Sequence, residues 1–167
     1  MSQRLRDAQP GSVLFVCLGN ICRSPYAEHV FRSRVGDGVE ASSAGFILPG
    51  RQPPENALEV AATRGVSTTD HRSQVVSEDL LRGSDAVFIF DRFNAQRLRK
   101  LPSGPRGRVY WLGDFDPEWT GKRAIIDPWG KPAEEFDRTF ARIERCIDRV
   151  TRVLSDEERG RATGGTP

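Results

Sequence analysis

The amino-acid sequence predicts an α/β fold: a three-layer sandwich in which a four-stranded parallel sheet is flanked by helices. Short runs rich in β-branched and aromatic residues alternate with segments of helical character along the chain, which is typical of parallel sheets covered on both faces. The length of 167 residues suits one sheet of this kind. Hydrophobic residues make up 37% and charged residues 29%, as in folded, water-soluble domains. We therefore expect residues 1–167 to form a single domain.

The first half of the chain is predicted to contain strands at 12–16 and 39–44 and helices at 24–34 and 55–64. The first strand is a short β-branched and aromatic run. Ser24 can cap the helix that follows, and Pro25 suits its first turn. Gly36 and Gly65 mark the ends of the two helices, because glycine is common just past the last helical residue.

The second half is predicted to contain a short helix at 77–81, strands at 86–90 and 109–112, and helices at 92–100 and 133–154. The last helix follows a long loop, and its apolar residues recur at helical spacing. The two ends of the chain, residues 1–11 and 156–167, are polar, and we expect them to be flexible.

Charge, apolar runs and cysteine count exclude several classes of protein. The 25 basic and 23 acidic residues give a net charge of +2, which is too balanced for a nucleic-acid-binding surface. No apolar run approaches the roughly 20 residues of a membrane span, and the polar N-terminal stretch lacks the apolar core of a signal peptide. Three cysteines without a Cys-x-x-Cys pair argue against a disulfide scaffold and a zinc site. We expect a cytoplasmic protein that binds neither nucleic acid nor membrane.

The most informative segment lies between the first strand and the first helix and reads CLGNICRSP from Cys17 to Pro25. A loop in this place points backbone N–H groups at one spot, where the helix dipole adds positive potential, so it attracts a phosphate-like anion. Arg23 can grip two oxygens of that anion. The same groups favour the thiolate form of Cys17, which can attack phosphorus. Cys17 could instead be a small core residue, but the Cys-x5-Arg-Ser-Pro spacing favours the nucleophile.

A thiolate that displaces an oxygen needs an acid for the leaving group and then a base for water. Two Asp–Pro pairs, at Asp116 and Asp127, lie in the long loop that starts at the sheet edge where the cysteine loop begins. Either can be a turn residue only, which is the usual meaning of Asp–Pro. The apolar neighbours Ile125, Ile126 and Trp129 would shield Asp127 from water and favour its protonated form. This favours Asp127 as the acid.

From Ser12 to Leu154 the sequence resembles the low-molecular-weight protein tyrosine phosphatases. The most specific pieces are VLFVCLGNICRSPYAE at 13–28 and IDPW at 126–129. Shorter ones are SAG at 43–45, FIFD at 88–91 with Asn94, and LG at 112–113 with Asp116-Pro117. The resemblance implies the flavodoxin-like phosphotyrosine phosphatase I fold, with neither a metal nor an organic cofactor.

The resemblance also implies roles for individual residues. Cys17 matches the nucleophile, Arg23 the phosphate clamp and Asp127 the general acid and base, whereas Asp116 matches a non-catalytic turn. The phosphate-binding loop would comprise Leu18, Gly19, Asn20, Ile21, Cys22, Arg23 and Ser24.

Supporting roles follow in the same way. Asn20 and Ser43 match positions that hold the shape of the loop by hydrogen bonds, and Ser24 matches a hydroxyl that stabilises the thiolate. Cys22 matches a residue that forms a reversible disulfide with the nucleophile, which implies a redox-sensitive site. His71 falls near a family histidine, and we interpret it as a structural residue.

Two departures from the family pattern bear on the substrate. Phe46 to Gly50 is shorter and more aliphatic than usual, closer to bacterial members linked to exopolysaccharide kinases, and Trp129 stands where many relatives have tyrosine. We expect Phe46, Leu48 and Trp129 to form the pocket wall, together with Ile21. This wall suits an aryl phosphate, and Ile21 points to phosphotyrosine because relatives that act on phosphoarginine have threonine there.

Several alternatives stay open. A phosphoarginine phosphatase would use the same loop. An arsenate reductase would need further cysteines to relay a disulfide, and none lies between Cys22 and Cys146. A phosphate-binding module without activity would not need both Cys17 and Asp127. The expected partner is a phosphotyrosine-containing protein, of which a cognate tyrosine kinase is one candidate, and the enzyme is expected to be a monomer or a weak dimer.

Overall fold

A parallel sheet with the strand order β2-β1-β3-β4 forms the centre of the molecule. Its strands are β1 (Ser12–Val16), β2 (Glu40–Ala44), β3 (Ala86–Ile89) and β4 (Arg108–Trp111). The computed structural model describes residues 1–102, 104–105, 107–119 and 121–162, apart from the side chains of residue 37 and residues 156–162. The predicted strands are confirmed to within one residue at each end.

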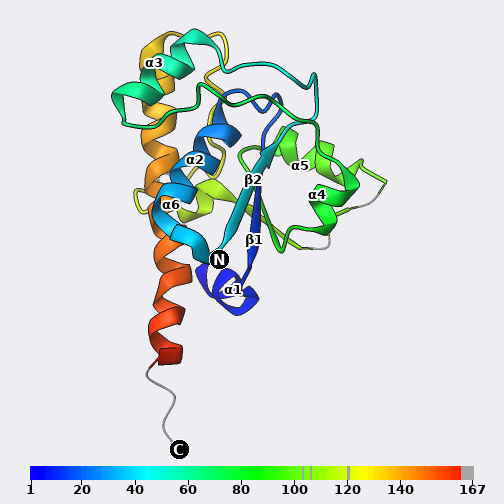
Figure 1. Ribbon diagram of the computed structural model, residues 1–167, viewed down its shortest axis with the longest axis vertical. Coiled ribbons are helices and arrows are strands. Elements are labelled where there is room, and N and C mark those ends of the chain that lie inside the picture. The colour runs from blue at the N-terminus through cyan, green and yellow to red at the C-terminus, as the bar shows by residue number, and fades with distance from the viewer. Residues whose placement is uncertain (103, 106, 120, 163–167) are drawn as a thin grey trace, which may run out of the picture.

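Helices cover both faces of the sheet (Figure 1). They are α2 (Arg23–Val35), α3 (Glu55–Thr63), α4 (Glu78–Arg82), α5 (Arg92–Arg99) and α6 (Ala133–Ala162), with short 3-10 turns at Gly36–Gly38 and Leu112–Phe115. None of the helices in the described part of the chain combines the length and the apolar character that a membrane span needs.

The alternation of side chains along β1 divides the core into two parts. Val13 and Phe15 point to the face covered by α2 and α6, where they join the larger apolar cluster. Leu14 and Val16 point to the opposite face, where they pack against buried residues of α4 and α5. All four side chains are at most 1% exposed. The predicted three-layer α/β sandwich is therefore confirmed.

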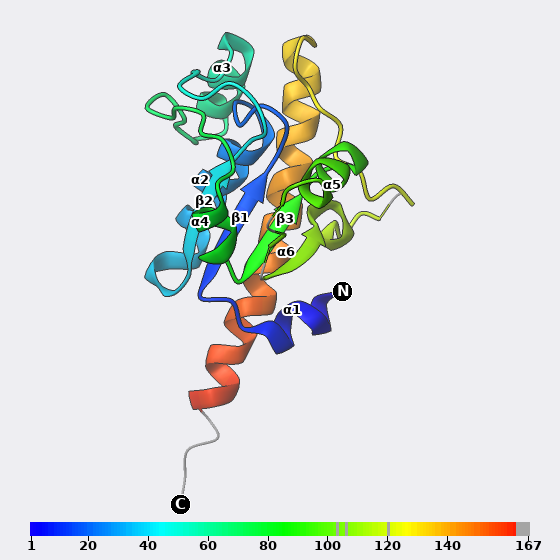
Figure 2. The ribbon, with the colours of Figure 1, turned by 90° about the vertical axis from the view of Figure 1, so that its right-hand side faces the viewer.

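The prediction of a flexible N-terminal end is wrong. Residues Ser2–Ala8 form a helix, α1, which lies below the sheet beside the lower half of α6 (Figure 2). Leu5 is fully buried in the larger cluster, and the carbonyl oxygen of Arg4 accepts a hydrogen bond from the Tyr110 hydroxyl at 3.1 Å. Tertiary packing therefore orders a short segment that has little helical pattern of its own.

The C-terminal end also differs from the prediction. Helix α6 continues to Ala162, past the predicted end near Leu154 and into the stretch that we expected to be flexible. The rest of that stretch, residues 163–167, lies outside the described residues.

The order of the strands determines where a ligand can bind. The connection from β1 to β2 runs through α2 on one face, and the connection from β3 to β4 runs through α5 on the other. The two connections therefore leave β1 and β3, which are neighbours, on opposite faces of the sheet. In α/β sheets a crevice forms where neighbouring strands diverge in this way, at their carboxyl ends. Val16, the last residue of β1, lies opposite Ile89 of β3. Cys17 and Asp91 follow these strands, so they meet at this crevice.

Candidate active site

The segment between Cys17 and Arg23 forms a tight loop between β1 and α2. The structure places the Sγ atom of Cys17 3.0 Å from the Oγ atom of Ser24 and 3.3 Å from the backbone nitrogen of Asn20, which donates to it. Helix α2 begins at Arg23, and Ser24 does not cap it, contrary to the prediction. The Ser24 hydroxyl is therefore available to Cys17.

Asn20 holds the centre of the loop. Its φ angle of 52° lies in the left-handed region, which asparagine tolerates better than most residues. Its Nδ2 atom donates at 2.9 Å to both Ser24 and Ser43, and its Oδ1 atom accepts from the backbone nitrogen of Gln74 at 2.9 Å. The Nε2 atom of His71 lies 2.8 Å from the Asn20 carbonyl oxygen and donates to it, because a carbonyl only accepts. These contacts come from three separate segments and fix the shape of the loop.

Gly45 lets a neighbouring segment pass close to the loop. A Cβ atom at this position would lie 2.8 Å from both the backbone nitrogen of Asn20 and the carbonyl oxygen of Leu18. The next residue, Phe46, donates its backbone N–H to that same Leu18 oxygen at 2.8 Å. Only glycine fits here without moving the loop.

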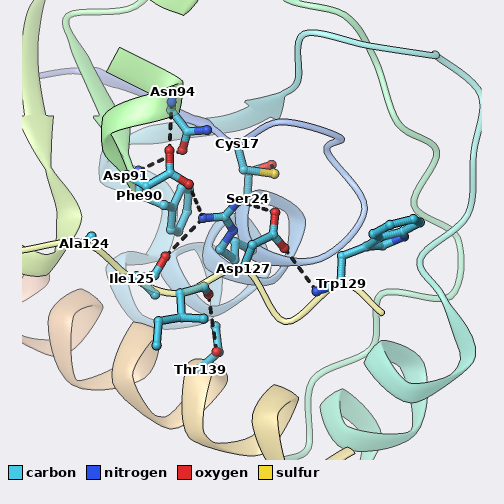
Figure 3. A network of polar contacts seen from close by, with 12 residues as sticks. Cys17, Ser24, Phe90, Asp91, Asn94, Ala124, Ile125, Asp127, Trp129 and Thr139 are labelled. Atoms are coloured by element: carbon cyan, nitrogen blue, oxygen red, sulfur yellow. Dashed lines mark hydrogen bonds and ion pairs between the residues drawn. The ribbon is translucent and has the colours of Figure 1, made fainter. Parts of the chain in front are cut away.

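Arg23 is 1% exposed and lies at the centre of a network of polar contacts, whose partners Asp91, Ile125 and Asp127 are labelled in Figure 3. Its Nη1 atom donates to Asp91 at 2.6 Å and to the Ile125 carbonyl oxygen at 3.0 Å, and its Nη2 atom donates to Asp127 at 2.5 Å. Its Nε atom is buried without a hydrogen-bond partner among the described residues. Burial alone would lower the pKa of the guanidinium, but negative charge on Cys17, Asp127 and Asp91 outweighs it and raises that pKa. Arg23 therefore stays charged, and two of its five N–H donors, the one on Nε and the second on Nη2, are left for a ligand.

Asp127 lies at the mouth of the site rather than in an apolar shield. Its side chain is 38% exposed, whereas we expected its neighbours to cover it. Ile126 and Trp129 are 66% and 64% exposed, so their side chains leave the carboxylate open to solvent. The Oδ1 atom of Asp127 accepts the backbone N–H of Trp129 at 3.2 Å, and Oδ2 binds Arg23. Figure 3 shows Cys17, Ser24, Asp91 and Asp127 gathered around one point.

A cavity of about 130 Å³ opens above Cys17. It is lined by Cys17, Leu18, Gly19, Ile21, Cys22, Ile47, Arg51, Asp127 and Trp129. Of the expected wall residues, Trp129 and Ile21 line this cavity and Phe46 and Leu48 do not; Ile47 and Arg51 lie there instead. Phe46 instead packs against the smaller apolar cluster on the far face of the sheet, and Leu48 is 63% exposed with a φ angle of 45°.

Arg51 was not anticipated from the sequence. Its Nη2 atom donates to the carbonyl oxygen of Gly19 at 2.8 Å, and its Nε atom donates to that of Leu48 at 3.0 Å. The side chain thus joins the pocket wall to the phosphate-binding loop and brings a positive charge to the cavity. Asp91 was expected only as part of the FIFD motif at 88–91, and its contact with Arg23 was not anticipated.

Cys22 lies in the same loop and is 4% exposed. Burial raises the pKa of its thiol, and negative charge on Cys17 and Asp127 raises it further. Cys22 therefore stays protonated near neutral pH, whereas the sulfur of Cys17 contacts the Ser24 hydroxyl and the Asn20 backbone N–H. Among the described residues, no three His, Cys, Asp or Glu side chains lie close enough together to hold a metal ion.

Comparison with known proteins agrees with this geometry. A model of the family described as low molecular weight phosphotyrosine protein phosphatase matches residues 12–159. The probable low molecular weight protein-tyrosine-phosphatase AmsI of Erwinia amylovora is 28% identical over 144 residues, which cover 86% of this chain and 97% of the relative. The low molecular weight protein-tyrosine-phosphatase Wzb of Escherichia coli K12 is 31% identical over 148 residues, which cover 88% and 97% of the two chains.

Solved structures give the same result. The crystal structure of the Erwinia amylovora tyrosine phosphatase AmsI superposes with a TM-score of 0.77 at 29% identity and covers 87% of this chain and 93% of its own. The YwlE arginine phosphatase from Geobacillus stearothermophilus superposes with a TM-score of 0.78 at 28% identity, covering 89% and 96%. Because the family model matches nearly the whole length of this chain, the chain belongs to the low molecular weight phosphotyrosine protein phosphatases.

Proposed function

We propose that this chain hydrolyses phosphotyrosine in protein substrates through a phosphocysteine intermediate. Cys17 is the nucleophile, Arg23 clamps the phosphate, and Asp127 is the general acid and base. One observation carries the proposal: Cys17 and Asp127 line the same cavity, and Arg23, which contacts Asp127, has an unpaired buried donor. A phosphate group in the loop would supply the missing acceptor.

In the first step the Cys17 thiolate attacks phosphorus, so that an S–P bond forms and the P–O bond to the tyrosine ring breaks. Protonated Asp127 gives its proton to the departing phenolate oxygen. The exposure of Asp127 lets it exchange protons with solvent between turnovers. The hydrogen bonds from Ser24 and from the Asn20 backbone nitrogen stabilise the negative charge on sulfur.

In the second step the Asp127 carboxylate takes a proton from water, and the water oxygen attacks phosphorus. The S–P bond breaks, inorganic phosphate leaves, and the Cys17 thiolate is restored. Arg23 neutralises the phosphoryl oxygens in both steps, held in place by its bond to Asp91 at 2.6 Å.

The cavity wall supports an aryl phosphate as substrate. Ile21, Ile47 and Trp129 offer apolar surface to a flat ring. Phosphoarginine is the alternative, since one structural neighbour is an arginine phosphatase. The cationic guanidinium part of a phosphoarginine side chain would meet the cation of Arg51 on the same wall, so we favour phosphotyrosine.

Two other readings of the loop are weaker. An arsenate reductase needs a relay of cysteines, but Cys146 is fully buried in α6, and burial, followed by the charge of Asp116, raises the pKa of its thiol to about 12. A binding module without activity would not need an acid placed opposite a thiol.

The protein substrate can be narrowed further as a proposal. The short aliphatic stretch from Phe46 to Gly50 resembles bacterial members linked to exopolysaccharide kinases, so a cytoplasmic tyrosine kinase of that kind is the substrate that we propose. All three cysteines are unpaired, which suits a reducing compartment. Such a kinase should gain phosphotyrosine in cells that lack this enzyme; unchanged phosphorylation would contradict the assignment.

The activity is tested by hydrolysis of p-nitrophenyl phosphate in EDTA, from mildly acidic to mildly alkaline pH. We expect activity in the wild type, none in Cys17→Ser, and a strong loss in Asp127→Asn. A folded wild type that binds vanadate but hydrolyses nothing would favour the binding module. Peptides carrying phosphotyrosine or phosphoarginine then separate the two substrate classes.

A further inference from the structure

We propose that Glu28, a buried carboxylate on α2 with no part in the chemistry described above, is a positioning residue for the Cys17 thiolate. It acts as the final acceptor of a chain of hydrogen bonds that ends on the sulfur atom. The inference rests on the proposed function of Cys17 as nucleophile and adds a residue that does not touch the substrate.

The chain of hydrogen bonds crosses three elements. The Oγ atom of Ser43, on β2, donates to Oε2 of Glu28 at 2.6 Å. Ser43 in turn accepts from Nδ2 of Asn20 at 2.9 Å, and the same Nδ2 donates at 2.9 Å to Ser24, whose Oγ lies 3.0 Å from Sγ of Cys17. Ser24, Ser43 and Asn20 are fully buried, so water does not substitute for any of these partners.

The directions of the bonds at Asn20 and Ser43 are determined. The backbone nitrogen of Gln74 can only donate, so the atom of Asn20 that it meets at 2.9 Å is Oδ1, and the amide group faces the two serines. Ser24 therefore receives a hydrogen from Asn20 and gives its own to the Cys17 thiolate at 3.0 Å, which can only accept, or to the Ala44 carbonyl oxygen at 3.4 Å. Ser43 also receives one from Asn20 and must pass its own hydrogen to an acceptor, which is Glu28.

An acceptor is needed at the position of Glu28. Without one, the buried hydroxyl of Ser43 would have to turn away from Asn20 to satisfy its hydrogen. Asn20 would then lose a contact that holds its left-handed backbone conformation, and the hydrogen bonds to the sulfur would loosen. The Glu28 side chain is 10% exposed, and its other oxygen, Oε1, lies 2.9 Å from Arg32, which is 55% exposed.

Among the described residues, Arg32 forms an ion pair with Glu28, and His29 interacts with its charge. Burial lowers the pKa of His29 despite the opposing charge of Glu28, so His29 is neutral near neutral pH. Arg32 also donates from Nε and Nη2 to the Ala41 carbonyl oxygen, so this half-exposed side chain keeps a partner if the carboxylate is replaced. A glutamine at position 28 can therefore turn its carbonyl oxygen to Ser43 and keep the chain intact, whereas a methionine of similar size cannot accept at all.

The experiment compares Glu28→Gln with Glu28→Met by the pH dependence of inactivation by iodoacetate, which reports the thiolate of Cys17 without requiring turnover. We expect Glu28→Gln to leave the midpoint of the inactivation profile close to wild type. Glu28→Met should raise the midpoint by about one pH unit, since the loss of one hydrogen bond in the chain is of that size. The value of kcat/KM for an aryl phosphate should fall about tenfold in the same variant.

Matched controls separate positioning from simple stabilisation. Glu144 on α6 is also a partly buried carboxylate that accepts from a hydroxyl, Tyr26, and binds an arginine, Arg64. Glu144→Gln and Glu144→Met should change thermal stability but leave the iodoacetate midpoint unchanged. In a double-mutant cycle, Glu28→Met combined with Ser43→Ala should lose no more than Ser43→Ala alone.

The proposal is overturned if Glu28→Gln and Glu28→Met shift the midpoint equally, because charge rather than an acceptor would then matter. It is also overturned if both only lower the thermal stability, or if the effects of Glu28→Met and Ser43→Ala multiply. Should Glu28→Met not fold, a clear shift in Glu28→Gln still contradicts it. A wild type that hydrolyses no aryl phosphate yet shows the expected midpoints would reject the proposed function and leave the positioning role standing.

Discussion

Two Asp–Pro turns in the same stretch of chain have opposite surroundings. The Asp116 side chain is 1% exposed and is bound by Arg142 at 2.8 Å and Arg145 at 3.2 Å, both on α6. The Asp127 side chain is 38% exposed and faces the cavity beside Arg23. The same dipeptide therefore anchors the scaffold at one position and borders the cavity at the other. The role of an Asp–Pro pair in this protein therefore depends on which side chains the fold packs against the aspartate.

The largest expected effect is that of Asp127→Asn on catalysis. We expect kcat to fall about 10²- to 10⁴-fold, the usual contribution of a general acid or base, with little change in thermal stability. The loss should shrink for aryl phosphates whose phenols are more acidic, because these leave without a proton. Steady-state kinetics across a series of substituted phenyl phosphates checks this. A loss that is equal across the series would break the assignment of Asp127 as the acid.

Asp116→Asn is expected to do the reverse. Removing a buried carboxylate from two arginines should lower the free energy of unfolding by about 3 kcal/mol, while kcat and KM stay close to wild type. Urea denaturation measured beside steady-state kinetics compares this variant with Asp127→Asn. If Asp116→Asn were fully stable but inactive, the structural role of Asp116 would be contradicted, and Asp116 rather than Asp127 would be the candidate acid.

Cys146, which lies near Asp116, gives a smaller effect that depends on pH. Burial, followed by the charge of Asp116, raises the pKa of its thiol to about 12, whereas a cysteine in an unfolded chain titrates at about 8.5. The unfolded chain therefore loses this proton first, so the stabilisation is complete below about pH 8.5 and is lost as the pH rises toward 12.

The measurement is the free energy of unfolding of the wild type and of Cys146→Ala between about pH 9 and about pH 11. The difference between them should fall by up to about 1.4 kcal/mol per pH unit. It should fall less steeply in an Asp116→Asn background and as steeply in an Asp127→Asn background. A constant difference over this range would mean that the folded thiol titrates normally.

The smallest effect is expected in the pocket wall, where two adjacent residues again divide between site and scaffold. Ile47 lines the cavity, and Phe46 packs on the far face of the sheet. Ile47→Ala should raise KM for an aryl phosphate several-fold without lowering stability much. Phe46→Ala should instead lower the unfolding free energy by a few kcal/mol and leave KM unchanged. If Phe46→Ala raised KM as much as Ile47→Ala does, Phe46 would belong to the pocket wall, as the sequence predicted.

The strands and the phosphate-binding loop could be predicted because their signals are local. β1 is a continuous apolar run, and Cys17 and Arg23 are close enough in sequence for their spacing to indicate a single loop. Wall residues could not be predicted in the same way. Beyond Gly45 the chain leaves the sheet, and the left-handed turn at Leu48 breaks any alternation of side chains.

Contacts between distant segments were also invisible in the sequence. Arg23 meets Asp91 because β1 and β3 are neighbours, and it meets Asp127 because the loop after β4 is joined to the end of β3 by the Ile125–Phe90 backbone hydrogen bond. Helix α1 was missed because its one buried apolar residue, Leu5, shows no periodic pattern, and its packing against the rest of the fold is what orders it.

The most direct test of the central claim is to trap the phosphocysteine. Wild type and Cys22→Ser are mixed with a phosphotyrosine peptide, quenched with acid within one turnover, digested and analysed by mass spectrometry. We predict one phosphoryl group on Cys17 in both proteins, and neither phosphoryl group nor hydrolysis in Cys17→Ser. Hydrolysis by Cys17→Ser, or rapid turnover by the wild type with the phosphoryl group on another residue, would contradict the account.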